Sequence, residues 1–268
     1  MKNSKKIIRK DYGEWALVTG ASSGIGKSFA ELLSDQGINT ICISNEKDQQ
    51  AEICKSFKQK YNIESIPCYV DLANENFLKK INETIGDRII SILICCASFG
   101  FVGKFEDQDV EIYKEMIHVN VYSYLRLIHQ FYSDMIKRNN GAIILTSSVN
   151  VSSPLGLSAV YTATKAFEFY LGEALCWESR DSDLDILVLL PGPTRTNFQK
   201  TAGTKVTSYA MDPLKVAEIG LKNLGKKWFT IAGWRSKLFF YIGQLLFPKR
   251  RIKLASKTYL RQLLKKNR

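Results

Sequence analysis

The sequence has no long apolar segment. Within its 268 residues, no run approaches the ~20 apolar residues that a membrane-spanning helix requires. The positive charges near the N-terminus are not followed by an apolar core, so we expect no secretory signal. These charges come from Lys2, Lys5, Lys6, Arg9 and Lys10. A reducing, cytoplasmic location is the resulting expectation.

Metal-ligating residues are few and scattered. His118 and His129 have no histidine, cysteine or carboxylate partner at ligand spacing. The cysteines mostly lie in apolar runs and lack the spacing of a zinc site, so we expect small buried hydrophobic residues and no metal. They are Cys42, Cys54, Cys68, Cys95, Cys96 and Cys176.

Acidic residues are absent from the end of the chain. From Ile219 to Arg268 there are fourteen Lys or Arg and no Asp or Glu, whereas the preceding 218 residues hold 24 basic and 26 acidic residues. The formal net charge of +12 therefore comes from this C-terminal part. Nucleic acid binding would use similar charges, but no recognition module accompanies them, so we expect no nucleic acid partner.

The rest of the chain has the pattern of one α/β domain. Strand-like and helix-like segments alternate without a linker, and 268 residues are enough for one sizeable core. We expect residues 1–232 to form this domain. Residues 233–268 are expected to form a basic amphipathic extension that is not an independent domain.

A glycine-rich turn joins the first predicted strand, Trp15 to Thr19, to a helical pattern over residues 27–36. This order is the context of a phosphate-binding loop, in which backbone N–H groups at a helix start bind an anion. Gly24 would let the backbone approach a pyrophosphate, and Gly26 would let helix and strand pack closely. A plain glycine-rich turn is the alternative. The turn consists of Gly20, Ala21, Ser22, Ser23, Gly24, Ile25 and Gly26.

The end of the second predicted strand, residues 38–44, bears on the choice of cofactor. An acidic residue there would bind an adenosine ribose and favour NAD, but Ser44 and Asn45 occupy these positions. NADP is therefore favoured over NAD, although the arginine often found with NADP is missing too. After the third predicted strand, Asp71 would either accept a hydrogen bond from an adenine amino group or cap a helix.

Ser148, Tyr161 and Lys165 form the most distinctive chemical pattern. Tyr161 and Lys165 are four residues apart, so on a helix they share one face. An ammonium beside a phenol would lower the pKa of Tyr161 from about 10 and make it a general acid or base. Ser148 follows a strand-like run over residues 142–147 and would polarise a carbonyl oxygen. A chance tyrosine–lysine spacing is the alternative.

Three further segments accompany this pattern. A long helix predicted from Asp109 to Lys137 is interrupted around Met116 to Tyr122 by His118 and Asn120. Asn120 would bend the helix or hold a water, or else be exposed or bonded through its side chain. The turn from Pro191 to Thr196 closes the sixth predicted strand, where a nicotinamide would lie. The segment from Gln199 to Met211 has no strong pattern and suits a mobile lid over a substrate.

Together these residues resemble the short-chain dehydrogenase/reductase family over roughly residues 12–232. The resemblance implies one Rossmann domain with a doubly wound parallel sheet of about seven strands. The residues that match in identity, order and separation are Thr19–Gly26, Asp71, Asn120, Ser148, Tyr161, Lys165 and the Pro191–Gly192 turn.

The resemblance also implies roles for individual residues. Tyr161 would donate or accept the proton, and Lys165 would lower its pKa and bind the nicotinamide ribose. Ser148 would orient the substrate and Asn120 would hold a relay water. The implied cofactor-binding residues are Gly20, Ser22, Ser23, Gly24, Ile25, Gly26, Asn45, Asp71, Leu72, Ala97, Tyr161, Lys165, Pro191, Gly192, Thr194 and Thr196.

The activity implied by the resemblance is hydride transfer between NADP, or alternatively NAD, and a carbonyl or secondary alcohol of a hydrophobic substrate. The segments around Lys27 and from Gly141 to Lys165 look most like those of reductases of 3-oxoacyl or steroid substrates. Family members often pair through helices corresponding to Asp109–Lys137 and Ala159–Glu178. A homodimer or homotetramer is therefore expected.

One departure from the family supports a different class of function. Where the family usually has Asn-Asn-Ala-Gly, this chain has Cys95, Cys96, Ala97 and Ser98. A thiol is a poorer hydrogen-bonding partner than an amide, and a serine side chain adds bulk beside the cofactor ribose, so cofactor affinity would fall. The alternative is a non-catalytic dinucleotide-binding or membrane-associated scaffold protein.

The C-terminal extension has basic and apolar sides. Aromatic and aliphatic bulk beside basic residues suits a helix in a membrane interface. A segment packed over the substrate pocket, or in a dimer seam, is the alternative. The recurring basic residues are Lys253, Lys257, Arg261 and Lys265, and the apolar ones are Ile252, Tyr259, Leu260, Leu263 and Leu264.

Overall fold

The computed structural model describes residues 12–246 and 248–266, and the side chains of these except 248, 258–259 and 262–266. The basic residues between Lys2 and Lys10, and the side chains of Tyr259, Leu263, Leu264 and Lys265, lie outside this description. None of the described helices is long and apolar enough to cross a membrane.

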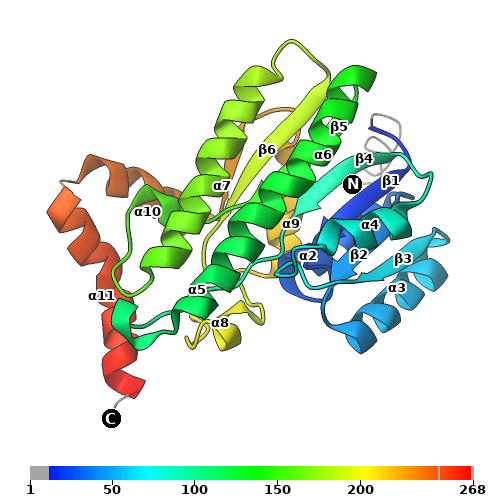
Figure 1. The fold of residues 1–268 in the computed structure, drawn as a ribbon. Coiled ribbons are helices and arrows are strands. Elements are labelled where there is room, and N and C mark those ends of the chain that lie inside the picture. Colours follow the sequence, from blue (N-terminus) through cyan, green and yellow to red (C-terminus); the bar gives the residue numbers. More distant parts are fainter. Residues whose placement is uncertain (1–11, 247, 267–268) are drawn as a thin grey trace.

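Seven parallel strands form one sheet, as predicted (Figure 1). Their order is β3-β2-β1-β4-β5-β6-β7, so the chain reverses its direction of travel across the sheet between β1 and β4. Every residue of the central strands β4 and β5 is buried, because helices cover both faces of a parallel sheet. The strands are β1 (Trp15–Thr19), β2 (Asn39–Ser44), β3 (Ser65–Tyr69), β4 (Ile90–Cys95), β5 (Gly141–Thr146), β6 (Leu184–Pro191) and β7 (Phe229–Ala232).

Two helical layers enclose the sheet, and each has its own apolar core. On one face, α2 (Gly24–Asp35), α3 (Lys47–Tyr61) and α9 (Pro213–Asn223) contribute Phe29, Phe57 and Val216. On the other face lie α4 (Phe77–Ile85), α6 (Ser123–Arg138) and α7 (Ala159–Glu178). The glycine turn is therefore held between a buried strand and a helix that packs one face against the sheet.

The interruption predicted in the long helix is confirmed. The helix α5 (Val110–Ile117) ends in one wide turn, η2 (His118–Tyr122), from which α6 continues. Asn120 lies in this turn and is fully buried. A wide turn of this kind accommodates one additional residue and bends the helix, and such turns occur often at functional sites.

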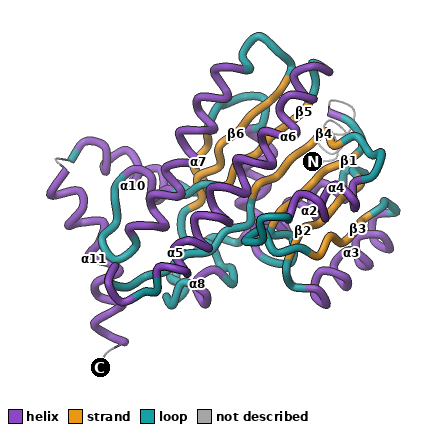
Figure 2. Tube along the Cα trace, in the orientation of Figure 1, coloured by secondary structure: helices purple, strands orange, loops and turns teal. Residues whose placement is uncertain are grey.

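Two helices follow the last strand, α10 (Trp234–Leu245) and α11 (Pro248–Lys266). Figure 2 shows them on the side of the molecule opposite β3. Their contacts hold them against the domain. A Cβ built on Gly192 would lie 1.9 Å from Ser236 Oγ, and Gly156 N donates a hydrogen bond of 2.7 Å to Ser256 Oγ. Shorter elements are η1 (Phe105–Asp107), η3 (Val149–Ser152) and α8 (Phe198–Thr201).

Candidate active site

A cavity of about 820 Å³ lies at the carboxyl edge of the sheet. Open α/β folds place ligands at this edge, where the strand order reverses. Every predicted catalytic or cofactor-binding residue lines the cavity except Asn120. The sheet therefore gathers residues from Gly20 to Thr196 around one space.

The glycine turn has the geometry of an anion cradle. Gly24 has a φ of +56°, and a Cβ there would lie 2.8 Å from Thr196 Cγ2. A Cβ on Gly26 would lie 2.3 Å from Gly20 O. Ser23 makes no side-chain hydrogen bond that caps α2, and Ser22 to Gly26 line the cavity. Backbone N–H groups at this helix start therefore face a space that fits a phosphate.

The altered segment after β4 is held in place by Thr19, a residue to which the sequence analysis gave no role of its own. Thr19 Oγ1 accepts hydrogen bonds from Cys96 N at 2.8 Å and Ala97 N at 3.0 Å. This fixes the backbone beside the glycine turn. Burial raises the pKa of the Cys96 thiol to about 11, so this thiol is neutral at physiological pH.

At the other end of the cavity, Ser44, Asn45 and Asp71 lie on neighbouring strand ends. Ser44 Oγ accepts a hydrogen bond of 3.0 Å from Glu46 N. Asp71 Oδ1 accepts one of 2.9 Å from Ala73 N, so this side chain caps a turn. The contact between Asp71 and an adenine amino group stays a prediction.

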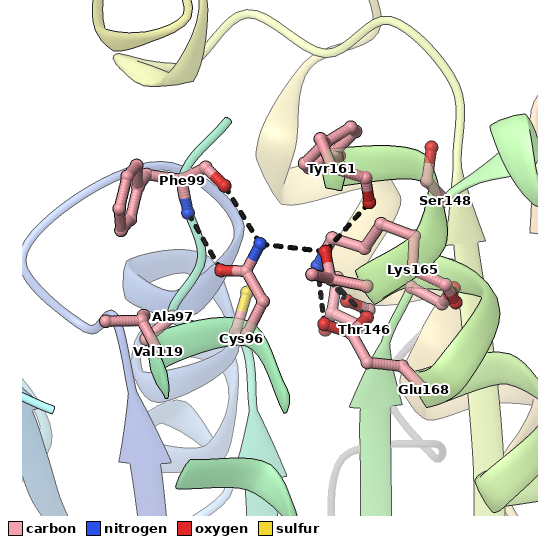
Figure 3. A network of polar contacts seen from close by, with 12 residues as sticks. Cys96, Ala97, Phe99, Val119, Thr146, Ser148, Tyr161, Lys165 and Glu168 are labelled. Carbon is pink, nitrogen blue, oxygen red and sulfur yellow. Dashed lines mark hydrogen bonds and ion pairs between the residues drawn. The ribbon is translucent and has the colours of Figure 1, made fainter. Parts of the chain in front are cut away.

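Tyr161 and Ser148 face the cavity together (Figure 3). The ring of Tyr161 is packed between Phe198, at 5.2 Å between ring centroids, and Gly100, where a Cβ would lie 2.9 Å from Tyr161 Cδ2. Ser148 Oγ accepts a hydrogen bond of 3.2 Å from Asn150 N. The neighbours of Tyr161 restrict where its ring can lie, as a group that exchanges a proton at a defined position requires.

Lys165 forms a buried ion pair that the sequence analysis missed. Its Nζ donates to Glu168 Oε1 at 2.9 Å, to Glu168 Oε2 at 3.0 Å and to Thr146 O at 3.0 Å. Lys165 is 1% exposed and Glu168 is fully buried. The ammonium lies 5.8 Å from the centroid of the Tyr161 ring, so the predicted proximity of lysine and tyrosine is present, with a counter-ion beside it.

The sequence contains a spacing pattern from which the burial of Glu168 could have been predicted. Tyr161, Lys165, Glu168 and Gly172 are spaced four, three and four residues apart, which is the spacing of one buried helix face. A glutamate on such a face requires a cation. Burial is the largest cause that raises the pKa of the Glu168 carboxyl to about 8, and the Lys165 ammonium opposes this rise.

Asn120 connects elements behind the cavity. Its Oδ1 accepts from Phe99 N at 3.2 Å, and its Nδ2 donates to Phe99 O at 2.9 Å and to Thr164 Oγ1 at 3.0 Å. Of the alternatives for this residue, exposure is wrong, and a side chain bonded within the protein is correct. The relay water stays a prediction. The bonds to Phe99 and Thr164 tie the loop after β4 to α7.

Part of the cavity wall comes from late parts of the chain. The segment predicted as a lid contributes Gln199, Thr204 and Tyr209, and the C-terminal helices contribute Phe239 and Ala255. The alternative in which the C-terminal extension packs over the pocket therefore describes α10 and the described part of α11. Across residues 12–246 and 248–266, no group of three or more His, Cys, Asp or Glu is placed to hold a metal ion.

The raised pKa of Glu168 predicts a pH dependence of stability. Because its folded pKa of about 8 lies above its ordinary value of 4.5, the stability that Glu168 contributes is fully present below pH 4.5 and is lost as pH rises to about 8. We expect the free energy of unfolding of the wild-type protein, relative to Glu168→Gln, to fall over this range by at least about 1 kcal/mol. Denaturant titrations at several pH values measure this difference.

The control for this experiment is Glu178→Gln, which removes an exposed carboxyl on the same helix. Because an exposed carboxyl carries little desolvation cost, we expect this variant to differ from the wild-type protein less than Glu168→Gln does. A flat difference for Glu168→Gln would contradict the prediction.

Comparison with known proteins places this site in a family. The family model described as short chain dehydrogenase matches residues 14–207, which is more than half of the chain. A 7beta-hydroxysteroid dehydrogenase from Clostridium sardiniense is 28% identical over 229 residues, or 84% of this chain and 88% of that protein. The human very-long-chain 3-oxoacyl-CoA reductase is 32% identical over 192 residues, or 70% of this chain and 62% of that protein.

Solved structures have the same fold. A short-chain dehydrogenase from Sphingobium yanoikuyae in complex with NADPH has a TM-score of 0.78 and 25% identity, with 86% of this chain and 92% of that chain covered. A structure from a study of 7beta-hydroxysteroid dehydrogenase stereoselectivity has a TM-score of 0.85 and 24% identity, with 92% and 98% covered. The family resemblance is thus confirmed, and the chain belongs to the short-chain dehydrogenase family of oxidoreductases.

Proposed function

We propose that this protein transfers a hydride between NADP(H) and a carbonyl or secondary alcohol group of a hydrophobic substrate. The observation that carries the proposal is that Ser148, Tyr161 and Lys165 meet the glycine turn in one cavity. Relatives named 7beta-hydroxysteroid dehydrogenase and very-long-chain 3-oxoacyl-CoA reductase support a lipid-like substrate. The NADPH complex of the Sphingobium protein supports the cofactor.

The residues of the cavity fit a dinucleotide. The start of α2 and the side-chain-free surface of Gly24 would receive the phosphates, and Ser44 and Asn45 would lie beside the adenosine ribose. The turn from Pro191 to Thr196 would border the nicotinamide, with Lys165 reaching its ribose. A bound nicotinamide would supply or accept the hydride.

The chemistry of the protein itself is proton exchange. In the reducing direction, Tyr161 donates its phenolic proton to the carbonyl oxygen of the substrate and later regains a proton from solvent; in the oxidising direction, these transfers are reversed. Ser148 donates a hydrogen bond to the same oxygen. Leu155, Phe198 and Phe239 supply apolar surface for the substrate.

Replacing Tyr161 by Phe tests this assignment. The substitution removes the proton donor and keeps the ring that packs against Phe198. We expect turnover to fall by at least about 100-fold, while dinucleotide affinity stays within about threefold of wild type. Steady-state kinetics with a panel of steroid and acyl ketones, together with fluorescence titration of NADPH, measure both quantities.

A matched control is Tyr170→Phe, which removes the hydroxyl of a tyrosine on the same helix that is 67% exposed. Its turnover should be unchanged. Full activity in Tyr161→Phe would refute the proposed role of this residue.

The cofactor preference can be tested at Asn45. Ser44 and Asn45 occupy the end of β2 in the cavity wall, and the first carboxylate after them is that of Glu46. We expect NADPH to bind more tightly than NADH, and Asn45→Asp to weaken NADPH binding by at least about fivefold through repulsion of the 2′-phosphate. NADH is the internal control, because it lacks this phosphate.

Titrations of both dinucleotides also separate the proposal from its rival. If neither NADPH nor NADH binds the wild-type protein, the scaffold function gains support and the enzyme assignment is wrong. Equal losses for both cofactors in Asn45→Asp would contradict the preference for NADP.

We also propose that the outer face of α10 and α11 contacts an anionic membrane surface. By this outer face we mean the exposed side chains of the two helices, which include apolar groups and cations; residues 219–268 contain no acidic residue to oppose these cations. Its apolar members are Trp234, Leu238, Tyr241, Ile242, Leu245, Ile252, Leu254 and Leu260, and its cations include Lys237, Lys249, Arg250, Lys253 and Lys257.

Vesicle sedimentation tests this contact. We expect binding to vesicles that contain phosphatidylserine, weaker binding to neutral vesicles, and a loss of at least about fivefold in the double variant Trp234→Ser/Leu245→Ser. These side chains are 70% and 85% exposed, so the fold should tolerate the change. The control is Ile89→Ser, which alters a side chain that is 61% exposed just before β4. Equal binding by all three proteins would contradict the proposal.

The proposed assembly is a homodimer or homotetramer formed through α5, α6 and α7. Exposed apolar side chains on these helices support it, because such groups are commonly covered at interfaces. They are Val110, Ile117, Leu125, Tyr170 and Trp177.

A further inference from the structure

The buried ion pair of Lys165 and Glu168 uses all the hydrogen-bonding capacity of the lysine. An ammonium has three donors. Two point to the carboxylate oxygens of Glu168 and the third to Thr146 O, at distances of 2.9 to 3.0 Å (Figure 3). In this arrangement, Lys165 has no donor left for a ligand in the cavity that it lines.

The surroundings of Glu168 offer no substitute for Lys165. The titratable groups that face it are Tyr124 from α6, Cys95 and Cys96 at the end of β4, and Lys165 on its own helix. Tyr124 and both thiols are neutral, because burial raises the pKa of each. Lys165 is therefore the cation on which the charge of this carboxylate depends.

One uncharged group beside the pair is also unusual. Tyr124 is fully buried, and its ring centroid lies 5.8 Å from Lys165 Nζ. Its hydroxyl has no hydrogen-bond partner among the described residues. A protonated Glu168 would place a neutral O–H donor in the surroundings that it shares with Tyr124 and Lys165. Burying this neutral carboxyl costs less desolvation free energy than burying a carboxylate.

We propose that Glu168 is a positioning residue that controls Lys165: as a carboxylate it holds the ammonium away from the dinucleotide ribose, and protonation releases the ammonium to the ribose and to Tyr161. This inference rests on the proposed function, because it needs a dinucleotide beside Lys165. It adds a residue that acts through the lysine. When Glu168 takes up one proton from solvent, a donor of Lys165 becomes available for a ribose hydroxyl oxygen.

Two consequences follow from the charges. Dinucleotide binding and protonation of Glu168 favour each other, so binding takes up protons from solution. The positive charge of Lys165 also acts on Tyr161 without an opposing carboxylate once Glu168 is neutral, and this lowers the pKa of the phenol. A residue that only stabilised the helix would produce neither effect.

The experiment compares dinucleotide binding by the wild-type protein and by Glu168→Gln between pH 6 and pH 9.5. NADH is the probe, because it lacks the 2′-phosphate, which titrates near pH 6. We expect the wild-type Kd to increase by at least about tenfold from pH 6 to pH 9. The Kd of Glu168→Gln should be nearly constant and lower than that of wild type at pH 9, and Glu178→Gln should behave as wild type.

Two further measurements keep the inference testable even if Glu168→Gln folds poorly. Titration calorimetry of the wild-type protein at pH 8, in two buffers of different ionisation enthalpy, should reveal net proton uptake on NADH binding. In active preparations, the apparent pKa of kcat/KM for alcohol oxidation should be lower in Glu168→Gln than in wild type.

Failure of the inference and failure of the proposed function give different results. If the wild-type protein binds NADH with the same pH dependence as Glu168→Gln, or binds it without proton uptake, the role of Glu168 is wrong and the proposed function stands. If the wild-type protein binds neither NADH nor NADPH, both are wrong.

Discussion

The rest of the structure depends on one constraint: the seven strands all run in the same direction and are hydrogen-bonded into a single parallel sheet. Parallel strands end at one edge, so the residues that follow each of them are brought together whatever their separation in sequence. The glycine turn, the segment after Cys95, Ser148 and the turn at Pro191 are all such residues. Tyr161 and Lys165 instead enter the cavity from a helix, α7.

The features that could be predicted from the sequence are local ones. The glycine turn between Thr19 and Lys27 and the four-residue spacing of Tyr161 and Lys165 are patterns within a single element, and the structure brings both to one cavity. The interruption at Asn120 is also local, because a buried amide in mid-helix requires partners. In each case, a short stretch carries both the pattern and its physical reason.

The features that were missed depend on contacts between distant elements. Thr19 ends a strand in sequence, and its bonds to Cys96 and Ala97 exist only because β1 lies beside β4. The spacing of Glu168 from Tyr161 and Lys165 marks a shared helix face, but the packing of α7 against the sheet is what buries that face and makes the charge costly. Packing of the C-terminal extension over the pocket was one of the alternatives that the sequence left open, because the place of Phe239 and Ala255 in the cavity wall depends on how α10 and α11 fold back.

The hydrogen bond from Gly156 N to Ser256 Oγ joins the final helix to the loop that follows Ser148. The last described part of the chain is therefore a structural component of the active site, even though it follows the last strand of the sheet. A shortened protein that ended after β7 would keep every strand and the glycine turn, but it would lose one side of the substrate compartment.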